Sequence, residues 1–463
     1  MSYIKPIHLP KERIPILDEK NNCFKLKNIK YIHNYYKFDK FIIQSFIPII
    51  KPELREKFRN TCDYMFKNVG YGVFVFILNG KIHTYQIFAN TSEIKPGTQV
   101  ITKRQILKNN KTRRNKTTKT LGKPIVNMKK IGTNYFKFKA YDKWWEAETD
   151  KSIYFDLLKK CLKGTAITTC FFLNLNTHPV LFKKKCKQYI LHQDVCKNNQ
   201  IERNKYIPVL SGCTTKDHYD KCIVYPDTWE VITRKKFGVF CTNNFLDSLD
   251  KINTDWSTKT QTLMFRGNNK TCYHFDKDRN ERIKVIKILN DIKNQKNIDI
   301  NINVGLLKSN IQDNHIDNKH NYGNENTILN YGINNFSESI PMYQQSNCKY
   351  ILDIDGHANP WRLCFELSYN SCIILMLSNY VSWFYDSLKH MKNIYIIDVN
   401  SSHLKKDIYN CLTLLGKNDK IGEKIAEGGV DLYNKIMNYN YVKKYMVSLL
   451  SEPEFDIFLP LHN

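Results

Sequence analysis

The stretch from Tyr350 to Met376, YILDIDGHANPWRLCFELSYNSCIILM, decides the fold class. An apolar run over 350–354 ends in Asp355-Gly356, and a second apolar run over 373–377 follows about one helix-length later. Strands that are apolar on both faces and alternate with helices are typical of a parallel sheet covered by helices on each side. The stretch therefore predicts an α/β fold.

Arg362 lies between these two runs, in a segment that begins like a helix. Asn359 and Pro360 are residues preferred at a helix N-cap and first helical position, so the pattern predicts Arg362 as the third helical residue. Unsatisfied N–H groups, the helix dipole and a guanidinium together favour an anion there, and Gly356 permits close approach of the backbone. An ion pair between Arg362 and Glu366, one turn later, is an alternative equally compatible with the spacing.

The same alternation extends along most of the chain after residue 135. Apolar runs predicted as strands occur at 165–175, 206–212, 260–267 and 393–399, and amphipathic runs predicted as helices at 152–164, 278–292, 404–415 and 424–450. An Asn-rich, low-complexity segment, 309–337, interrupts the pattern and is expected to be a surface insertion.

The first 130 residues mix helix and strand signals. A helix is predicted after Pro52, and YGVFVFILNGKIHTYQIF (71–88) predicts a hairpin turned by Asn79-Gly80. The basic stretch 103–130 has no apolar periodicity and is expected to be an exposed loop.

Composition restricts the possible partners only loosely. The formal net charge is +27, from 71 Lys and Arg against 44 Asp and Glu, which favours polyanions such as nucleic acid or phosphates. However, the lysines are spread along the chain beside many asparagines, and both have A/T-rich codons, which favours a compositional origin of the charge. The 14 cysteines form no Cys-x-x-Cys pair, which is typical of reduced thiols in a cytosolic protein. Neither a signal peptide nor an apolar run of about twenty residues is evident, so we expect no membrane span.

A second arginine follows another predicted strand. Arg266-Gly267 closes the run 260–267, again at a carboxyl edge of the expected sheet. Two arginines at neighbouring strand ends suit a diphosphate better than a monophosphate. A Gly-x-Gly-x-x-Gly motif and a Walker-type lysine loop are absent, so an ordinary dinucleotide or ATP site is not indicated.

Several of these segments occur together in a recognisable order: WSTKTQTLMFRGNN (256–269), RNERIKVIKIL (279–289), CKYILDIDGHANPWRLCFELSYNSCIILM (348–376), WFYDSLKHMKNIYIIDV (383–399) and IAEGG (425–429). In this order the sequence resembles glycosyltransferase family 90, which includes protein O-glucosyltransferases, capsule xylosyltransferases and lipopolysaccharide-modifying relatives. It is most similar to the members carried by large DNA viruses, which share the hairpin GVFVFILNGK. The resemblance runs from about 64 to 436.

The resemblance implies a GT-B architecture, in which two Rossmann-like domains face each other across a cleft. It divides the chain into a mixed α/β N-terminal extension (1–130), an acceptor-side Rossmann-like domain (131–240), a UDP-sugar-binding Rossmann-like domain (241–430) that holds the insertion 309–337, and a C-terminal helical segment (431–463).

The resemblance also implies which residues bind the donor. The family's two diphosphate-contacting arginines match Arg266 and Arg362 here, and the loop between Gly356 and Arg362 takes the place of the segment that wraps the nucleotide. The expected donor-binding residues are Arg266, Gly267, Gly356, His357, Ala358, Asn359, Pro360, Trp361 and Arg362.

The implied chemistry is inverting transfer of a sugar, of glucose or xylose type, from a UDP-sugar to a hydroxyl of a protein or glycan. Two arginines can stabilise the leaving diphosphate, so neither a metal nor another cofactor is expected. Asp353-Ile354-Asp355 has the Asp-x-Asp spacing of a metal site, but it stands at a strand end and we interpret it as structural.

The sequence departs from the family at the catalytic base. The family places an aspartate in an Asn-x-Arg-Asp-aromatic-Pro motif, and the matching stretch here, NLNTHP (174–179), has Thr177 at the Asp position. Threonine is no base near neutral pH, so His178 beside it becomes a candidate, and Asp194 and Asp217 in neighbouring loops are others. Losing a general base typically costs about 10²–10⁴-fold in rate.

Three outcomes stay open: a slow transferase, a transferase with a relocated base, and a UDP-sugar-binding fold without turnover. The competing hypothesis is a catalytically inactive viral component that is structural or binds nucleic acid through 103–130. We expect a location in the host-cell cytoplasm or a viral factory. Four tryptophans are candidates to stack on sugars, although core positions are the commoner reading: Trp144, Trp145, Trp229 and Trp383.

Overall fold

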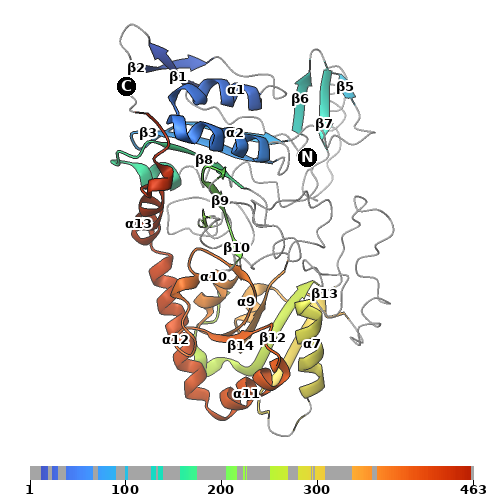
Figure 1. The fold of residues 1–463 in the computed structure, drawn as a ribbon. Coiled ribbons are helices and arrows are strands. Elements are labelled where there is room, and N and C mark those ends of the chain that lie inside the picture. The colour runs from blue at the N-terminus through green and yellow to red at the C-terminus, as the bar shows by residue number, and fades with distance from the viewer. Residues whose placement is uncertain are drawn as a thin grey trace. The chain divides into compact units, whose positions relative to one another are not determined.

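A computed structural model describes residues 12–18, 23–29, 38–65, 71–89, 100–102, 127–131, 134–138, 157–174, 205–215, 223–224, 226, 251–268, 280–293, 295, 298–307, 336–356 and 362–459. The chain divides into two compact units (Figure 1). Unit 1 comprises residues 1–176, 202–210 and 444–463, and unit 2 comprises 177–201 and 211–443.

The predicted hairpin is confirmed in unit 1. Strands β3 (Tyr71–Leu78) and β4 (Lys81–Ala89) pair antiparallel. Asn79 and Gly80 between them have φ angles of 47° and 69°, as a two-residue hairpin turn of type I′ requires. A Cβ atom at Gly80 would lie 2.4 Å from the Thr165 carbonyl oxygen, so this turn position admits only glycine.

The hairpin lies in the same sheet as a strand from a later part of the chain. β8 (Thr169–Leu173) pairs antiparallel with β3 and parallel with β9 (Val209–Ser211). The family resemblance assigned the hairpin to the N-terminal extension and β8 to the acceptor-side domain. In the structure they share one sheet, and residues 74–78 of β3 are all buried, as is expected of an interior strand with a partner on each side.

Helices of unit 1 begin earlier than predicted. Besides α2 (Arg55–Tyr64), expected after Pro52, the structure contains α1 (Phe38–Phe46) before that proline. Phe46 at the end of α1 is buried, with its ring centroid 4.9 Å from that of Phe74 and 5.1 Å from that of Phe76. Burial of these aromatic rings fixes α1 against the sheet, although its first residues carry little helix signal.

Two smaller antiparallel sheets also belong to unit 1. β1 (Glu12–Asp18) pairs with β2 (Cys23–Ile29), and β7 (Asn134–Phe138) lies between β5 (Val100–Thr102) and β6 (Asn127–Ile131). The expectation of a loop over the whole of 103–130 was wrong at its end, because residues 127–130 form β6 by pairing with β7. Residues 103–126 lie outside the described ranges.

Unit 2 contains a parallel sheet, which confirms the α/β prediction. Its five strands have the order β13-β12-β14-β15-β17, and every neighbouring pair is parallel. The strands are β12 (Thr260–Asn268), β13 (Asn301–Leu307), β14 (Cys348–Ile354), β15 (Cys372–Leu377) and β17 (Tyr395–Asp398). In chain order this is 2-1-3-4-5, a doubly wound Rossmann-like topology whose strand order reverses between β12 and β14.

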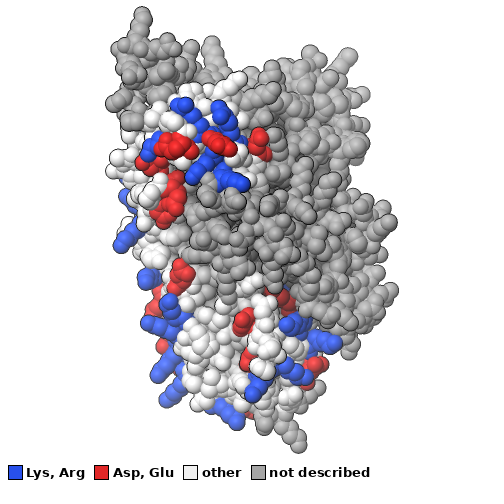
Figure 2. All heavy atoms as spheres, in the orientation of Figure 1, with Lys and Arg blue, Asp and Glu red and all other residues white. Residues whose placement is uncertain are grey.

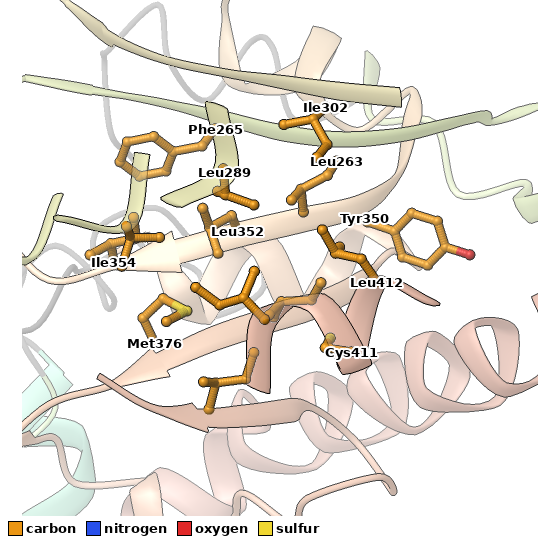
Figure 3. Close-up of a cluster of buried hydrophobic side chains, with 14 of the residues drawn as sticks. Leu263, Phe265, Leu289, Ile302, Tyr350, Leu352, Ile354, Met376, Cys411 and Leu412 are labelled. Atoms are coloured by element: carbon orange, nitrogen blue, oxygen red, sulfur yellow. The ribbon is translucent and has the colours of Figure 1, made fainter. Parts of the chain in front are cut away.

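One face of this sheet is covered by α7 (Glu281–Ile292) and α11 (Leu404–Lys417), and a single apolar core fills the space between (Figure 3). Leu263 and Phe265 of β12 and Leu352 and Ile354 of β14 point into it, with the two-residue period of a strand. The core explains why the runs at 260–267, 350–354 and 373–377 are readable from sequence.

The remaining elements of unit 2 are shorter or follow the sheet. They are β10 (Thr214–Thr215), β11 (Ile223–Val224), β16 (Tyr380–Val381), α9 (Met342–Gln345), α10 (Leu363–Glu366), α12 (Asp419–Ile436) and α13 (Tyr439–Leu450), whose last residues belong to unit 1. Short 3-10 helices occupy Trp256–Thr258, Leu367–Tyr369 and Tyr385–Ser387 in unit 2, and Ile47–Ile49, Pro52–Leu54 and Pro453–Phe455 in unit 1. Within the described ranges, no helix combines the length and the apolar character needed to cross a bilayer.

The Asn-rich insertion returns to the sheet at its last residue. Ser337 forms a parallel bridge with Leu307 of β13, and its N–H donates to the Leu306 carbonyl at 2.7 Å. Ser337 also packs on Gly305, where a Cβ atom would lie 1.7 Å from the serine Oγ. The chain therefore re-enters the fold beside the edge strand β13.

Candidate functional site

The carboxyl ends of β12 and β14 meet where the strand order of the sheet reverses. Leu263 and Met264 of β12 pair with Tyr350 and Ile351 of β14, so the two strands end side by side. Arg266-Gly267 closes one strand and Asp355-Gly356 follows the other. Doubly wound sheets bind their ligands in the crevice outside this reversal point, which makes this edge the candidate site.

The helix that follows β14 is shorter than predicted. The N–H groups of Phe365 and Glu366 donate to the Arg362 carbonyl at 2.8 and 2.9 Å, and the α-helical part spans four residues before a 3-10 turn. Arg362 is therefore the N-cap residue of α10, and its predicted place as the third helical residue was wrong. A helix this short has little dipole, so the side chain carries the chemistry.

The Arg362 guanidinium joins the two strand ends. Its Nη1 donates to the Arg266 carbonyl at 2.9 Å, and its Nε donates to Asp353 Oδ1 at 3.0 Å and lies 3.2 Å from Glu366 Oε1. The guanidinium carbon lies 5.0 Å from the Phe265 ring centroid. The ion pair with Glu366 that the spacing left open is thus present, and Asp353 shares it. Nη2 is buried and has no acceptor among the described residues.

Three carboxyl side chains are buried at this edge of the sheet: Asp353, Asp355 and Glu366. Burial raises the pKa of all three, and those of Asp355 and Glu366 lie well above the ordinary value. Burial alone would lower the pKa of Arg362, but Glu366 and Asp353 outweigh it and raise that pKa. Asp355 Oδ2 accepts a hydrogen bond from Ser378, so the two aspartates of the Asp-x-Asp spacing have different partners.

A second buried arginine, Arg282 on α7, supports the same edge. Its Nε and Nη2 donate to the carbonyls of Asp355 and Ile354 at 2.9 and 3.2 Å, and its guanidinium carbon lies 5.8 Å from the Phe265 ring centroid. Burial, followed by the charge of Arg362, lowers the pKa of Arg282 to about 10. We name Arg282, Asp353, Asp355, Arg362 and Glu366 the switch-point cluster.

Sequence reasoning missed Arg282, although a signal was present. Arg282 stands at the i−3, i−4 and i−7 spacing from Val285, Ile286 and Leu289, which form the buried stripe of α7. An arginine on the apolar stripe of a helix is expected to be paired or functional, because isolated buried charges are costly.

The other predicted arginine, Arg266, is placed differently. Its guanidinium turns toward β13, where Nη1 and Nη2 donate to the carbonyl and the side-chain Oδ1 of Asn303 at 2.9 and 2.6 Å. Its Nε donates to the Glu338 carbonyl at 3.1 Å. The hydrogen bond between Arg362 and Arg266 is to the backbone carbonyl of Arg266. The structure thus places the two guanidiniums on different partners.

Gly267 at the end of β12 allows the cluster to pack closely. A Cβ atom there would lie 2.8 Å from Phe265 Cζ and 3.2 Å from Arg282 Nη1. Gly356 is half-buried directly after β14. The other sequence candidates lie outside the described residues, and Trp383 alone among the four tryptophans lies within them. Those outside are His357, Ala358, Asn359, Pro360, Trp361, Thr177, His178, Asp194, Asp217, Trp144, Trp145 and Trp229.

Trp383 occupies a core position. Its side chain is buried, and its ring centroid lies 5.8 Å from that of Phe384 and 6.3 Å from that of Tyr441. The aromatic contacts of this tryptophan are those of packing within unit 2.

Similarity to solved structures is low. A protein described as Anabaena Alr3699/HepE in complex with UDP and glucose matches 65% of this chain and 76% of its own, at 8% identity and a TM-score of 0.35. A glycosyltransferase from Rickettsia africae matches 68% of this chain and 82% of its own, at 10% identity and a TM-score of 0.33.

Two viral proteins are similar in sequence. Uncharacterized protein 035R of Invertebrate iridescent virus 3 is 24% identical over 273 residues, which is 57% of this chain and 23% of that protein. Uncharacterized protein 179R of Invertebrate iridescent virus 6 is 24% identical over 317 residues, 60% of this chain and 26% of that protein. The matched region thus spans about a quarter of each viral relative.

A family model described as glycosyl transferase family 90 matches residues 190–453, more than half of the chain and all of the switch-point cluster. The match includes the doubly wound sheet, both strand ends and the helices that follow them. The chain belongs to glycosyl transferase family 90.

Proposed function

We propose that this protein binds a UDP-sugar at the switch-point cluster and transfers the sugar, with inversion, to a hydroxyl acceptor. Family membership supports the reaction class. The observation that carries the site is Arg362, whose buried Nη2 has no acceptor in the described part of the chain and lies where the strand order reverses. A diphosphate oxygen is an acceptor of the charge and geometry that a guanidinium prefers.

In this proposal the positive charge serves the leaving group. As the acceptor oxygen attacks the anomeric carbon, the bond to UDP breaks and negative charge develops on the diphosphate. A guanidinium that is already fixed can stabilise that charge without reorganising. Arg362 is fixed by Asp353, Glu366 and the Arg266 carbonyl, and we propose it as the principal diphosphate ligand, in a reaction that needs no metal.

The role of Arg266 differs from that of Arg362 in this proposal. Its guanidinium is bonded to Asn303 and Glu338, so a direct contact with the diphosphate requires it to leave these partners. We therefore expect Arg266→Ala to weaken binding less than Arg362→Ala. The loop 357–361 completes the donor site, as the family resemblance implies.

The acceptor hydroxyl needs a base, and Thr177 stands where the family has its aspartate. We propose His178 as the group that takes the proton, with glucose or xylose as the transferred sugar. Thr177 also favours a second candidate function, UDP-sugar binding without turnover, because threonine cannot take a proton near neutral pH.

Nucleic-acid binding has less support. On the face drawn in Figure 2, the described Lys and Arg side chains are interspersed with Asp and Glu. The described side chains on this face therefore do not form the single-sign patch that favours a polyanion.

The test is thermal unfolding of the full chain with UDP, UMP and uridine, for the wild type and for Arg362→Ala, Arg362→Lys and Arg266→Ala. At about 100 times its Kd, UDP should stabilise the wild type by about 2.7 kcal/mol. Arg362→Ala should lose most of this effect and Arg362→Lys should keep part of the charge attraction without its fixed geometry. Uridine should change the thermal stability of the wild type and of all variants equally, because it lacks the diphosphate.

Lys405→Ala is the matched control, since Lys405 pairs with Asp291 on the exposed surface of unit 2. It should respond to UDP as the wild type does. A folded wild type that UDP does not stabilise, or an Arg362→Ala variant that UDP stabilises fully, contradicts the proposed site.

A further inference from the structure

Asp353 and Glu366 bring two buried carboxyl groups to the same N–H of Arg362. The two residues are 0% and 2% exposed. Arg362 Nε donates to Asp353 Oδ1 at 3.0 Å and lies 3.2 Å from Glu366 Oε1, so the two carboxyl groups converge on one N–H. Asp353 Oδ2 and Glu366 Oε2 are buried without a hydrogen-bond donor in the described part of the chain.

A hydrogen bond between two carboxyl groups requires one of them to carry a proton, because an ionised carboxylate is only an acceptor. Two carboxylates in one buried site repel each other, and sharing a proton removes the repulsion. The single Nε–H of Arg362 can be donated fully to one oxygen only, so it does not neutralise both groups.

We propose that Glu366 is a neutral carboxylic acid that donates its proton to Asp353, and that this acid–carboxylate pair positions Arg362 for its anionic ligand. The identity of the ligand rests on the proposed function, whereas the protonation of Glu366 does not. Asp353 then accepts from Arg362 Nε on one oxygen and from Glu366 on the other. Both aspartate oxygens are satisfied, the guanidinium is held at its Nε edge, and Nη2 is left for the ligand.

The charge balance of the switch-point cluster follows from this proton. The three carboxyl groups and Arg282 are buried, and the Arg362 side chain is 14% exposed, so with every acid ionised the switch-point cluster is negative and repels a diphosphate. With Glu366 neutral, the two guanidiniums face two carboxylates at most. The other ionisable groups around the pair are Glu281 and Arg282 of α7, Asp355 after β14, Tyr369 of the 3-10 turn and Tyr433 of α12.

The direction of the pKa shifts agrees with this assignment. Burial raises the pKa of both acids, and the nearby charge of Asp353 raises that of Glu366 further. A group whose pKa is higher in the folded state than in the unfolded state stabilises the fold. Its contribution to the free energy of unfolding is complete at a pH below its unfolded pKa. This stability is lost as the pH rises through the folded value. For Glu366 the loss begins above its ordinary value of 4.5.

The first experiment compares UDP affinity of the full chain for the wild type, Glu366→Ala, Glu366→Gln and Asp353→Asn. Glu366→Ala and Asp353→Asn each remove one side of the support of Arg362 and should weaken UDP binding by roughly 10–100-fold. Glutamine has the shape of the neutral acid and can donate its amide N–H to Asp353, so Glu366→Gln should restore most of the affinity lost in Glu366→Ala. Failure of Glu366→Gln to fold, or affinity as weak as that of Glu366→Ala, overturns the proposal.

The second experiment separates this inference from the proposed function. The free energy of unfolding is measured against pH, without ligand, for the wild type and Glu366→Gln. Glu281, whose pKa burial raises to about 7, is common to both proteins and cancels in the difference. The wild type should lose stability relative to Glu366→Gln as the pH rises above about 4.5. If the two profiles of unfolding free energy against pH are parallel, Glu366 is not protonated, whether or not UDP binds. If the wild type does not bind UDP but its profile differs from that of Glu366→Gln as expected, the proposed function alone is overturned.

Discussion

Thr177 stands where the family resemblance places the catalytic aspartate, next to His178, the base in this proposal. If Thr177 occupies the position of the family's base, Thr177→Asp should supply the missing carboxylate and increase UDP release from a UDP-sugar by about 10²–10⁴-fold. Single-turnover release of UDP, with water or a hydroxyl compound as acceptor, measures this directly. Asn176→Asp, which adds the same charge one residue earlier, is the control.

An unchanged rate in Thr177→Asp, with UDP binding intact, would mean that the base lies elsewhere. His178→Ala then becomes the informative variant, because loss of the remaining rate would assign the proton transfer to His178. We expect both variants to keep UDP binding, because the groups proposed to hold the diphosphate belong to the switch-point cluster.

At the level of single residues, the sequence identified the edge of the sheet but not its internal contacts. Arg362 and Gly356 stand where the pattern of strand ends indicated. The partners of Arg362 were only partly readable, because Glu366 is one turn away in sequence whereas Asp353 and the Arg266 carbonyl become neighbours through strand pairing. Arg282 was missed for the same reason: its partners, Ile354 and Asp355, are more than 70 residues away along the chain.

Among the structural elements, strands were predicted better than short helices. Of the five strands of the parallel sheet, the four that contain apolar runs, β12, β14, β15 and β17, were identified from sequence. β13 was not, because its alternation of Asn, Ile and Gly gives a weak signal, and its burial is uneven as an edge strand's is. α1 and the short α10 depend on packing rather than on propensity, so their limits could not be read from composition.

Helix α12 makes an unusually close approach at the IAEGG motif. A Cβ atom at Gly428 would lie 2.0 Å from the Lys392 carbonyl oxygen. Alanine normally stabilises a helix relative to glycine by about 1 kcal/mol, but here we expect Gly428→Ala to destabilise the protein by about 1–3 kcal/mol, because backbone must move. Urea unfolding measures the change.

The neighbouring substitution Glu427→Ala is the control for this prediction. Glu427 is exposed on the same helix, so its replacement should alter the free energy of unfolding by no more than about 0.5 kcal/mol. Equal or greater stability of Gly428→Ala would show that the contact with residue 392 is not tight.

Across the whole molecule, the net charge of +27 could also produce affinity for phosphates, through attraction by the surface charge and not through a specific site. Binding that neutralises about six phosphates weakens by about 10³-fold between roughly 50 and 200 mM salt. UDP held by a buried guanidinium should lose less than about tenfold over that range, because buried charges are screened less. Titration of UDP and of a single-stranded oligonucleotide at both salt concentrations distinguishes the two modes.

If the affinity for UDP falls as steeply as that for the oligonucleotide, surface charge rather than the switch-point cluster holds the nucleotide. At this scale the sequence predicted the α/β class and the parallel sheet of unit 2. It did not predict that the hairpin 71–89 joins β8, because pairing between distant strands leaves no local pattern.

Unit 1 includes residues from both ends of the described chain, which has a consequence for its biosynthesis. The ring centroid of Phe458 lies 5.4 Å from that of Phe76. Backbone hydrogen bonds join Lys51 to Ile457 and Leu459 to Ile49. At about 5–20 residues per second, a ribosome needs roughly 20–80 s to translate from Phe76 to Phe458. Throughout that interval the aromatic core of the nascent unit 1 lacks its last layer, so chaperones that shield apolar surface should bind this region first.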